Sequence, residues 1–348
     1  MVISTSTTRI VAIVGSLSGV VRVLRKTMLF ILVLGAALWC INTSITSSPL
    51  SDNSQVALLA HRGVHQQYDR TNLGRFECTA TRWYDTGHLF LENTLTSMQA
   101  AFELGAGIVE IDIQRTADDQ LAVFHDGTIE CRTEGSGGIS DHTLAELQTL
   151  DVGYGYTSAN GQNPFRGQGV GQLPSLREVF SAFPEGEFLI NFKSGRRSDG
   201  ELFAQLIEQN PQWRQNVWVV YGGHIPSQVA AERISGLKSF SRETIKSCLL
   251  NYLIKGWSTY IPESCRNTIV LLPLNVAPLM WGWPYKFENR MRKAGSTIVL
   301  AGAINRSNLG VIGIDSVSQL QKVPVGFSGH IWTNRIEVIG RNTANEEE

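Results

Sequence analysis

The chain has 348 residues, of which 43% are hydrophobic and 18% are charged. This length suits one large domain, because α/β barrels often exceed about 200 residues as a single unit. The formal net charge is −1 and the basic residues are dispersed. A nucleic-acid-binding protein would show a basic patch or stripe, so nucleic acid is not an expected partner.

The N-terminal segment is first basic and then strongly apolar. Four basic residues precede an uninterrupted apolar run over 27–41, and the first charge after it is Asp52. We therefore predict a basic cytoplasmic leader, 1–26, and a transmembrane anchor or signal-peptide apolar region, 27–45. The run is roughly 22 Å long as a helix, against a ~30 Å hydrocarbon core, but no convincing Ala-x-Ala cleavage site follows it. In either case, anchor or cleaved signal, the rest of the chain is exported to the periplasmic or extracellular face.

Five cysteines are present, and Cys40 lies inside the apolar run. An even number remains for the exported part, where an oxidising compartment favours disulfides. Proximity in the chain favours pairing Cys248 with Cys265, which leaves Cys78 with Cys131. The alternative is four free buried thiols.

After a polar linker, 46–55, short β-branched runs alternate with amphipathic stretches. This alternation predicts parallel βαβ units, and about eight strands predict closure into a (β/α)₈ TIM barrel over 56–340, followed by a polar tail, 341–348. An open doubly wound sheet is the alternative, but no Gly-x-Gly-x-x-Gly follows the first strand. We expect strands at 56–60, 108–113, 121–124, 188–192, 217–221, 268–272, 297–300 and 330–333, helices at 94–104, 176–183, 200–208, 242–255, 285–294 and 317–322, and long loops at 64–91 and 153–173 that wall the mouth of the site.

A pair of carboxylates occupies the second of these strands. Glu110 and Asp112 are two residues apart and therefore project to one face, while Ile111 and Ile113 point to the other, apolar face. Two such acids resist joint ionisation unless a cation lies between them. Oxygen ligands favour Mg²⁺ or Ca²⁺. The alternative is a polar inner face neutralised by internal salt bridges.

Two histidines directly follow predicted strands. His61 follows 56–60 and His125 follows 121–124, so both are expected at the carboxyl ends of parallel strands, where barrel enzymes place their catalytic groups. Two imidazoles suit a general acid and a general base near neutral pH. Arg62 offers a planar fork for phosphate oxygens, and Asp126 either orients His125 or caps the next turn.

A second alternating pair follows further along the chain. Asn191 and Lys193 share one face of the predicted strand at 188–192 or its end. Lys193 would contact phosphate as a point charge, and Asn191 would lend its amide oxygen to the metal.

Taken together, the motifs and their order make the chain similar to the glycerophosphodiester phosphodiesterase family over essentially all of 56–340. Six motifs in order are more specific than any one of them. They are His61-Arg62-Gly63, Glu92-Asn93-Thr94, Glu110-x-Asp112, His125-Asp126, Asn191-x-Lys193 and Trp332-Thr333-Asn334.

The resemblance implies a (β/α)₈ barrel, a divalent cation, and hydrolysis of glycerophosphodiesters to glycerol 3-phosphate and an alcohol. It leaves the alcohol, the ion and the oligomeric state unspecified. The implied roles are His61 and His125 as the acid/base pair, Glu110 and Asp112 as metal ligands, Arg62 and Lys193 as phosphate contacts, and Glu92 as a group bordering the site.

One position departs from the family pattern. The family usually has glutamate where this chain has Asn191, so the formal ligand charge falls from −3 to −2. This puts the identity of the metal in doubt. Two other interpretations stay open: phospholipase D-like activity on intact or lyso-lipids, with Trp281, Trp283 and Pro284 as an apolar lip, and a barrel that binds phosphodiesters without catalysis.

Overall fold

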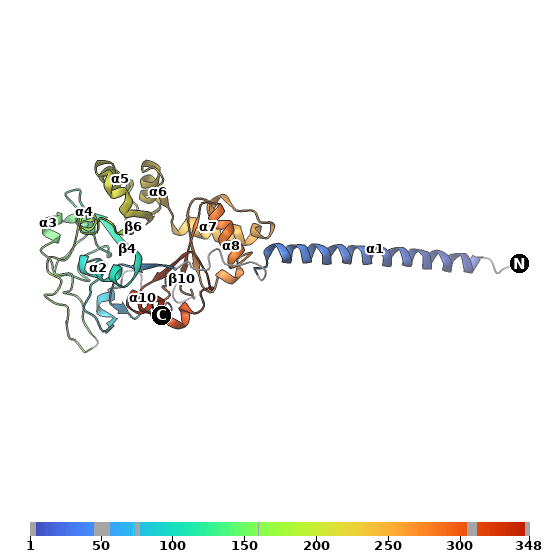
Figure 1. Cartoon of the computed structure of the whole chain (residues 1–348), viewed down its shortest axis with the longest axis horizontal. Coiled ribbons are helices and arrows are strands. Elements are labelled where there is room, and N and C mark those ends of the chain that lie inside the picture. Colours follow the sequence, from blue (N-terminus) through green and yellow to red (C-terminus); the bar gives the residue numbers. More distant parts are fainter. Residues whose placement is uncertain are drawn as a thin grey trace.

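The computed structural model describes residues 5–44, 56–71, 73, 77–158, 160–304 and 312–344, so the predicted linker lies outside the described residues. Helices and strands alternate along most of the chain (Figure 1). The helices are α1 (Thr5–Asn42), α2 (Leu95–Glu103), α3 (Leu144–Leu147), α4 (Leu176–Ala182), α5 (Arg197–Gln209), α6 (His224–Arg233), α7 (Arg242–Lys255), α8 (Tyr285–Lys293), α9 (Val317–Leu320) and α10 (Ile336–Ala344). The strands are β1 (Ala57–His61), β2 (Gln67–Tyr68), β3 (Trp83–Tyr84), β4 (Ala106–Arg115), β5 (Leu121–Val123), β6 (Glu187–Phe192), β7 (Val217–Gly222), β8 (Lys238–Ser239), β9 (Ile269–Pro273), β10 (Thr297–Ala301) and β11 (His330–Thr333).

Eight parallel strands form a nearly closed barrel in the order β8-β7-β6-β4-β1-β11-β10-β9. The predicted (β/α)₈ fold is confirmed. The barrel has a seam between its two end strands, β8 and β9, where the Thr268 hydroxyl donates to the carbonyl of Ser239 at 3.1 Å. A side chain therefore bridges the seam at this point.

The predicted strand at 121–124 is not a barrel strand. As β5 it pairs antiparallel with β4, opposite Ile113 to Arg115, so the prediction that His125 follows a parallel strand is wrong. The chain folds back along β4 instead, which carries His125 toward the carboxyl end of the barrel. The eighth barrel strand is the two-residue β8, which is too short to show period-two alternation.

Alternate residues of the barrel strands point inward and form layers. An apolar layer contains Leu59, Ile108, Leu189 and Val219, and two residues further along the strands the inner positions become polar, as at His61. Ile111 and Ile113 belong to the outer core under the helices, as predicted. The period of two therefore separates the site from the packing surface.

A second, smaller core lies between the long loops and the segment that begins in β5. Leu91, Phe124, Ile129, Tyr156 and Phe165 are among its buried members. The predicted loop at 64–91 also contains the antiparallel pair β2 and β3. These loops are therefore packed against one another and have their own hydrophobic support.

The two chain ends differ from the predicted boundaries. Helix α1 runs without a break through the predicted junction of leader and apolar segment, and Arg22–Asn42 is long and apolar enough to cross a membrane by length and composition. At about 1.5 Å per residue, these 21 residues span about 31 Å, close to a hydrocarbon core. At the other end, α10 continues to Ala344, so residues 341–344 of the predicted tail are helical.

Both predicted cysteine pairs are bonded. One disulfide joins Cys78 to Cys131 and the other joins Cys248 to Cys265. Cys40 is free and exposed.

Candidate active site

Strand register brings the polar inner positions together. His61 is the partner of Glu110 in the β1–β4 pairing, and Asp112 is the partner of Asn191 in the β4–β6 pairing. Asn191 in turn is the partner of Tyr221 on β7. Adjacent parallel strands lie about 4.8 Å apart, so these side chains form one polar layer above the apolar one.

The chain leaves β1 through two residues with positive φ, Arg62 at 56° and Gly63 at 75°. A Cβ on Gly63 would lie 2.8 Å from the backbone carbonyl of Ser97 in α2, which a side chain cannot tolerate. The Arg62 amide donates to the carbonyl of Glu110 at 2.9 Å. This turn fixes Arg62 over the carboxylates and requires glycine after it.

Arg62 is buried between two acidic side chains. Its Nη1 donates to Glu92 Oε1 at 3.0 Å, and its Nε lies 3.2 Å from Asp112 Oδ2. The second contact is an ion pair without hydrogen-bond alignment, because Nε has no hydrogen-bond partner. Burial alone would lower the pKa of Arg62, but Glu92 and Asp112 outweigh it and raise that pKa. Arg62 is therefore a fixed positive charge at the site.

The two strand carboxylates are fully buried and electrostatically unequal. Burial, and then the Asp112 carboxylate, raise the pKa of Glu110 to about 8. Burial would also raise the pKa of Asp112, but Lys193 and then Arg62 overcome it and lower that pKa. Asp112 is the ionised partner, which is the outcome expected for two neighbouring acids that share limited positive charge. Tyr221, which the motifs did not indicate, donates to Glu110 Oε1 at 2.6 Å.

His61 is held by a neutral partner. Its Nδ1 lies 2.7 Å from Asn334 Oδ1. The amide of Asn334 donates Nδ2 to Asp315 Oδ2 at 2.9 Å, so the amide oxygen faces His61 and the imidazole carries its proton on Nδ1. The other nitrogen, Nε2, lies 3.7 Å from Glu110 Oε2. Burial, and then Arg62, lower the pKa of His61 well below its usual value.

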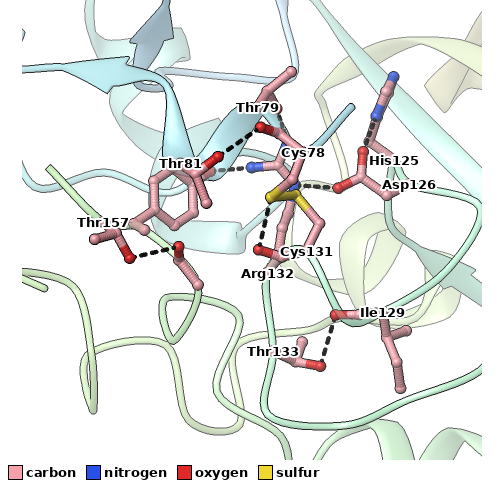
Figure 2. The surroundings of a disulfide bond; sticks show 12 residues. Cys78, Thr79, Thr81, His125, Asp126, Ile129, Cys131, Arg132, Thr133 and Thr157 are labelled. Atoms are coloured by element: carbon pink, nitrogen blue, oxygen red, sulfur yellow. Dashed lines mark hydrogen bonds and ion pairs between the residues drawn. A yellow bond between two sulfur atoms is a disulfide. The ribbon is translucent and has the colours of Figure 1, made fainter. Parts of the chain in front are cut away.

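His125 is held by a charged partner. Its Nδ1 lies 2.6 Å from Asp126 Oδ1 (Figure 2), so Asp126 orients this imidazole and the cap interpretation is not needed. Burial, and then Arg62, lower the pKa of His125, while Asp112 and Asp126 oppose that effect. The two histidines thus face the same cluster with different hydrogen-bond partners.

The sequence motifs did not indicate Arg132, which contacts both Asp126 and Glu92. Its Nε donates to Asp126 Oδ2 at 2.8 Å, and its Nη2 lies 3.3 Å from Glu92 Oε2. Nη2 also donates to Thr79 Oγ1 at 2.8 Å. Thr79 and Arg132 directly follow Cys78 and Cys131, so the disulfide joins the two segments that Arg132 bridges (Figure 2). The spacing of Arg132 after His125-Asp126 carries no chemical signal in a single sequence.

Glu92 therefore lies between two arginines. Burial would raise the pKa of Glu92, but Arg132 and then Arg62 lower it. The predicted border position of Glu92 is consistent with this place, since its carboxylate accepts a hydrogen bond from Arg62. The neighbouring Asn93, at φ 58°, donates Nδ2 to Asp112 Oδ2 at 3.0 Å.

Asn191 and Lys193 both contact Asp112. Lys193 Nζ lies 3.4 Å from Asp112 Oδ1, and Asn191 donates Nδ2 to the same oxygen at 2.8 Å. The Asn191 amide oxygen faces Gly222, where an added Cβ would lie 2.1 Å from it. Asn191 is thus a hydrogen-bond donor to Asp112 in this arrangement, because a carboxylate only accepts. A role as an oxygen ligand requires the amide to turn over.

The described part of the chain contains no group of three or more His, Cys, Asp or Glu side chains arranged to hold a metal ion. Glu110 and Asp112 offer two carboxylates, and burial, followed by the Asp112 carboxylate, raises the pKa of Glu110. This donor set fits a cation such as Mg²⁺, which takes one or two carboxylates and completes its shell with water and phosphate oxygens.

A model of the glycerophosphoryl diester phosphodiesterase family matches residues 61–247, more than half of the chain. The chain belongs to this family. It is 40% identical over 106 residues to a glycerophosphodiester phosphodiesterase of Caldanaerobacter subterraneus. The aligned region covers 30% of this chain and 40% of that protein. It is 30% identical over 133 residues to a lysophospholipase D of Rattus norvegicus, covering 37% of this chain and 40% of that one. The matches thus span less than half of each relative.

Solved structures agree on the fold. The glycerophosphoryl diester phosphodiesterase domain of a Mycobacterium tuberculosis protein aligns with a TM-score of 0.59 at 14% identity, covering 82% of this chain and 98% of that domain. A putative glycerophosphodiester phosphodiesterase from Galdieria sulphuraria aligns with a TM-score of 0.55 at 17% identity, covering 85% of this chain and all of that one.

Proposed function

We propose that this protein hydrolyses glycerophosphodiesters to glycerol 3-phosphate and an alcohol, as its family membership suggests. The proposal rests on two histidines that face one cluster of cationic and carboxylate side chains and have different hydrogen-bond partners. His61 rests on the amide of Asn334, and His125 rests on the carboxylate of Asp126. A protein that only bound phosphodiesters would need no such pair.

The partners suit the two imidazoles to different steps. A neutral amide stabilises an imidazolium less than a carboxylate does, so His61 is neutral before the reaction and its Nε2 is free to take a proton from water or from the substrate's own glycerol hydroxyl. The Asp126 carboxylate opposes the lowering of the His125 pKa by burial and Arg62, so His125 is the imidazole better suited to hold a proton and give it to the leaving alkoxide. Enzymes commonly set acid and base apart by giving two titratable groups different environments.

The cationic side chains would hold the phosphodiester. Arg62, fixed by Glu92 and Asp112, offers its guanidinium, and Lys193 offers a point charge beside the same aspartate. Arg62 is buried and Lys193 is partly exposed, and in a setting shielded from water the electrostatic stabilisation of a phosphoryl group is stronger than in water.

Glu110 and Asp112 would hold a divalent cation, Mg²⁺ or Ca²⁺. When bound, the ion would neutralise charge on the phosphoryl oxygens. Its presence would also favour the ionised form of Glu110, whose pKa is otherwise raised to about 8 by burial and then by Asp112. Asn191 would join the ligands only if its amide oxygen turned toward the pair.

Lysophospholipase D activity is the second candidate, because relatives named lysophospholipase D match this chain and α1 would bring the barrel to a membrane.

We propose that α1 anchors an exported barrel, with the basic leader in the cytoplasm. A cleaved signal peptide is the alternative, and N-terminal sequencing of the mature protein distinguishes them.

Phosphorus NMR of the products tests the activity. Glycerophosphocholine, glycerophosphoethanolamine and lysophosphatidylcholine would each be incubated with the full chain, with and without chelator. Glycerol 3-phosphate from the first two supports the main proposal, and lysophosphatidic acid from the third supports the second candidate. No product from any substrate in the presence of Mg²⁺ or Ca²⁺ would leave only a phosphodiester-binding barrel.

A further inference from the structure

The C-terminal end of α1 is fixed to the barrel by hydrogen bonds. Lys286 Nζ of α8 donates to the carbonyl of Cys40 at 2.7 Å, and Arg290 Nη2 donates to the carbonyl of Ile41 at 3.0 Å. Arg290 Nη1 also donates to Asn42 Oδ1 at 3.1 Å. Cationic side chains thus bind the last carbonyls of the helix, where the helix dipole favours positive charge.

Further contacts tie the same junction to neighbouring segments. Asn42 Nδ2 donates to the carbonyl of Trp257 at 2.9 Å, and the Ser44 hydroxyl donates to the carbonyl of Gly282 at 2.7 Å. Both acceptors lie beside α7 and α8, at the end of the barrel from which α1 projects (Figure 1). These bonds therefore fix how the barrel is oriented relative to α1.

Helix α7 presents an apolar stripe outward at this end. Its buried side carries Tyr252, which packs against Phe287 of α8. The outward positions recur at i, i+3, i+4 and i+7, the spacing of one helix face, and run into the following 3₁₀ turn, Gly256–Ser258. They are Leu250, Leu253, Ile254 and Trp257, all exposed, with Ile254 at 66%.

A second segment extends the stripe. Trp281 Nε1 donates to the carbonyl of Leu253 at 2.8 Å, and both Trp281 and Leu279 are exposed. We call these six residues the apolar collar. Of the predicted apolar lip, Trp281 belongs to the collar, whereas Trp283 packs against the main core.

We propose that the apolar collar lies in the interfacial layer of a lipid bilayer, on the side where α1 leaves the membrane. The proposal rests on α1 as the membrane anchor. Because α1 ends at Asn42, which is hydrogen-bonded to Trp257 of the collar, a bilayer that contains Arg22–Asn42 places its surface at the collar. Tryptophan prefers this layer, where its ring is buried and its N–H meets polar groups, and Lys286 and Arg290 would meet the headgroups.

Lipid-borne photolabelling of the full chain tests the proposal. The protein would be reconstituted in phosphatidylcholine–phosphatidylglycerol vesicles with a diazirine-bearing phospholipid, and labelled residues mapped by mass spectrometry. We expect labels in α1 and at Ile254, Trp257 and Trp281. Val170 and Leu89, at 58% and 71% exposure, serve as controls and should stay unlabelled. The green loops around Val170 lie on the side of the barrel away from α1 (Figure 1).

A variant pair sharpens the test. Leu253→Gln with Ile254→Gln should reduce labelling of Trp257 and Trp281 several-fold while labelling of α1 stays unchanged, and Val170→Gln should change neither. Labelling of α1 without the collar would overturn the proposal. An unlabelled α1 would sink the anchor and the collar together. Hydrolysis of a soluble substrate, read separately, reports on the proposed activity whichever result the labelling gives.

Discussion

The two disulfides lie in two regions of the barrel that differ in the polarity of their buried and exposed side chains. Cys78–Cys131 lies in the site region, where buried charges such as Arg132 and Glu92 each contact more than one partner. Cys248–Cys265 ties α7 to the 3₁₀ turn Glu263–Cys265, which precedes β9, in the region next to α1, where apolar side chains face outward. One barrel can thus concentrate buried polar groups in one region and exposed apolar groups in another.

The largest effect should come from the two histidines. Replacing His61 or His125 with alanine should lower turnover by about 10² to 10⁴, the usual range for a positioned proton-transfer group. The two variants should differ with a nitrophenyl leaving group, which needs no protonation: the loss should shrink for His125→Ala and persist for His61→Ala. Steady-state kinetics on both substrates would decide, and an equal response of the two variants would reject the assignment of acid and base.

The next effect contrasts the two disulfides directly. Replacing Cys78 and Cys131 with serine, or Arg132 with lysine, should lower turnover roughly 10- to 100-fold, the range for groups that orient a catalytic residue. The matched pair Cys248→Ser with Cys265→Ser should leave turnover near wild type and lower only thermal stability. Arg132 contacts Asp126, which in turn holds His125. The pH dependence of turnover should therefore also shift in the Arg132 variant. An unchanged profile with reduced stability would mean that Arg132 is only structural.

Arg115 provides the control for that experiment. It forms an ion pair with Asp119 at the surface, so Arg115→Lys should leave turnover and pH profile unchanged.

A smaller effect concerns His65 in the site region. Burial is the main cause that lowers the pKa of His65 from 6.5 to about 4. Between these values the unfolded chain binds a proton that the folded chain lacks, so stability falls as pH drops from 6.5 to 4, by up to about 1.4 kcal/mol per pH unit. His65→Gln should flatten this dependence. Urea unfolding at pH 7 and pH 5 measures the free energy of unfolding of both proteins. An equal change between the two pH values in wild type and His65→Gln would contradict the prediction.

The smallest effect concerns Asn191. Asn191→Glu should tighten divalent-cation binding a few-fold by adding a negative ligand, and Asn191→Leu should weaken it, because ligand charge tunes affinity for hard cations. Calorimetric titration of Mg²⁺ and Ca²⁺ into the three proteins compares them. Equal affinities would place Asn191 outside the metal shell, as a partner of Asp112 only.

Patterns within single strands and between chain neighbours were readable from the sequence. The period of two in β4 separated Glu110 and Asp112 from Ile111 and Ile113, and simple proximity paired Cys248 with Cys265, both as the structure has them. The alternation of strands and helices predicted the barrel. These features depend on local geometry, which neighbouring residues determine.

Tertiary structure alone decided how segments meet. The antiparallel course of β5 set the approach of His125, and the loops placed Arg132 beside Asp126 although nothing in their spacing indicates it. The stripe that ends at Trp257 has the spacing of a core-facing helix surface, yet it faces outward. A helical period states that one face is apolar, but only the packing of the other elements determines which face is covered.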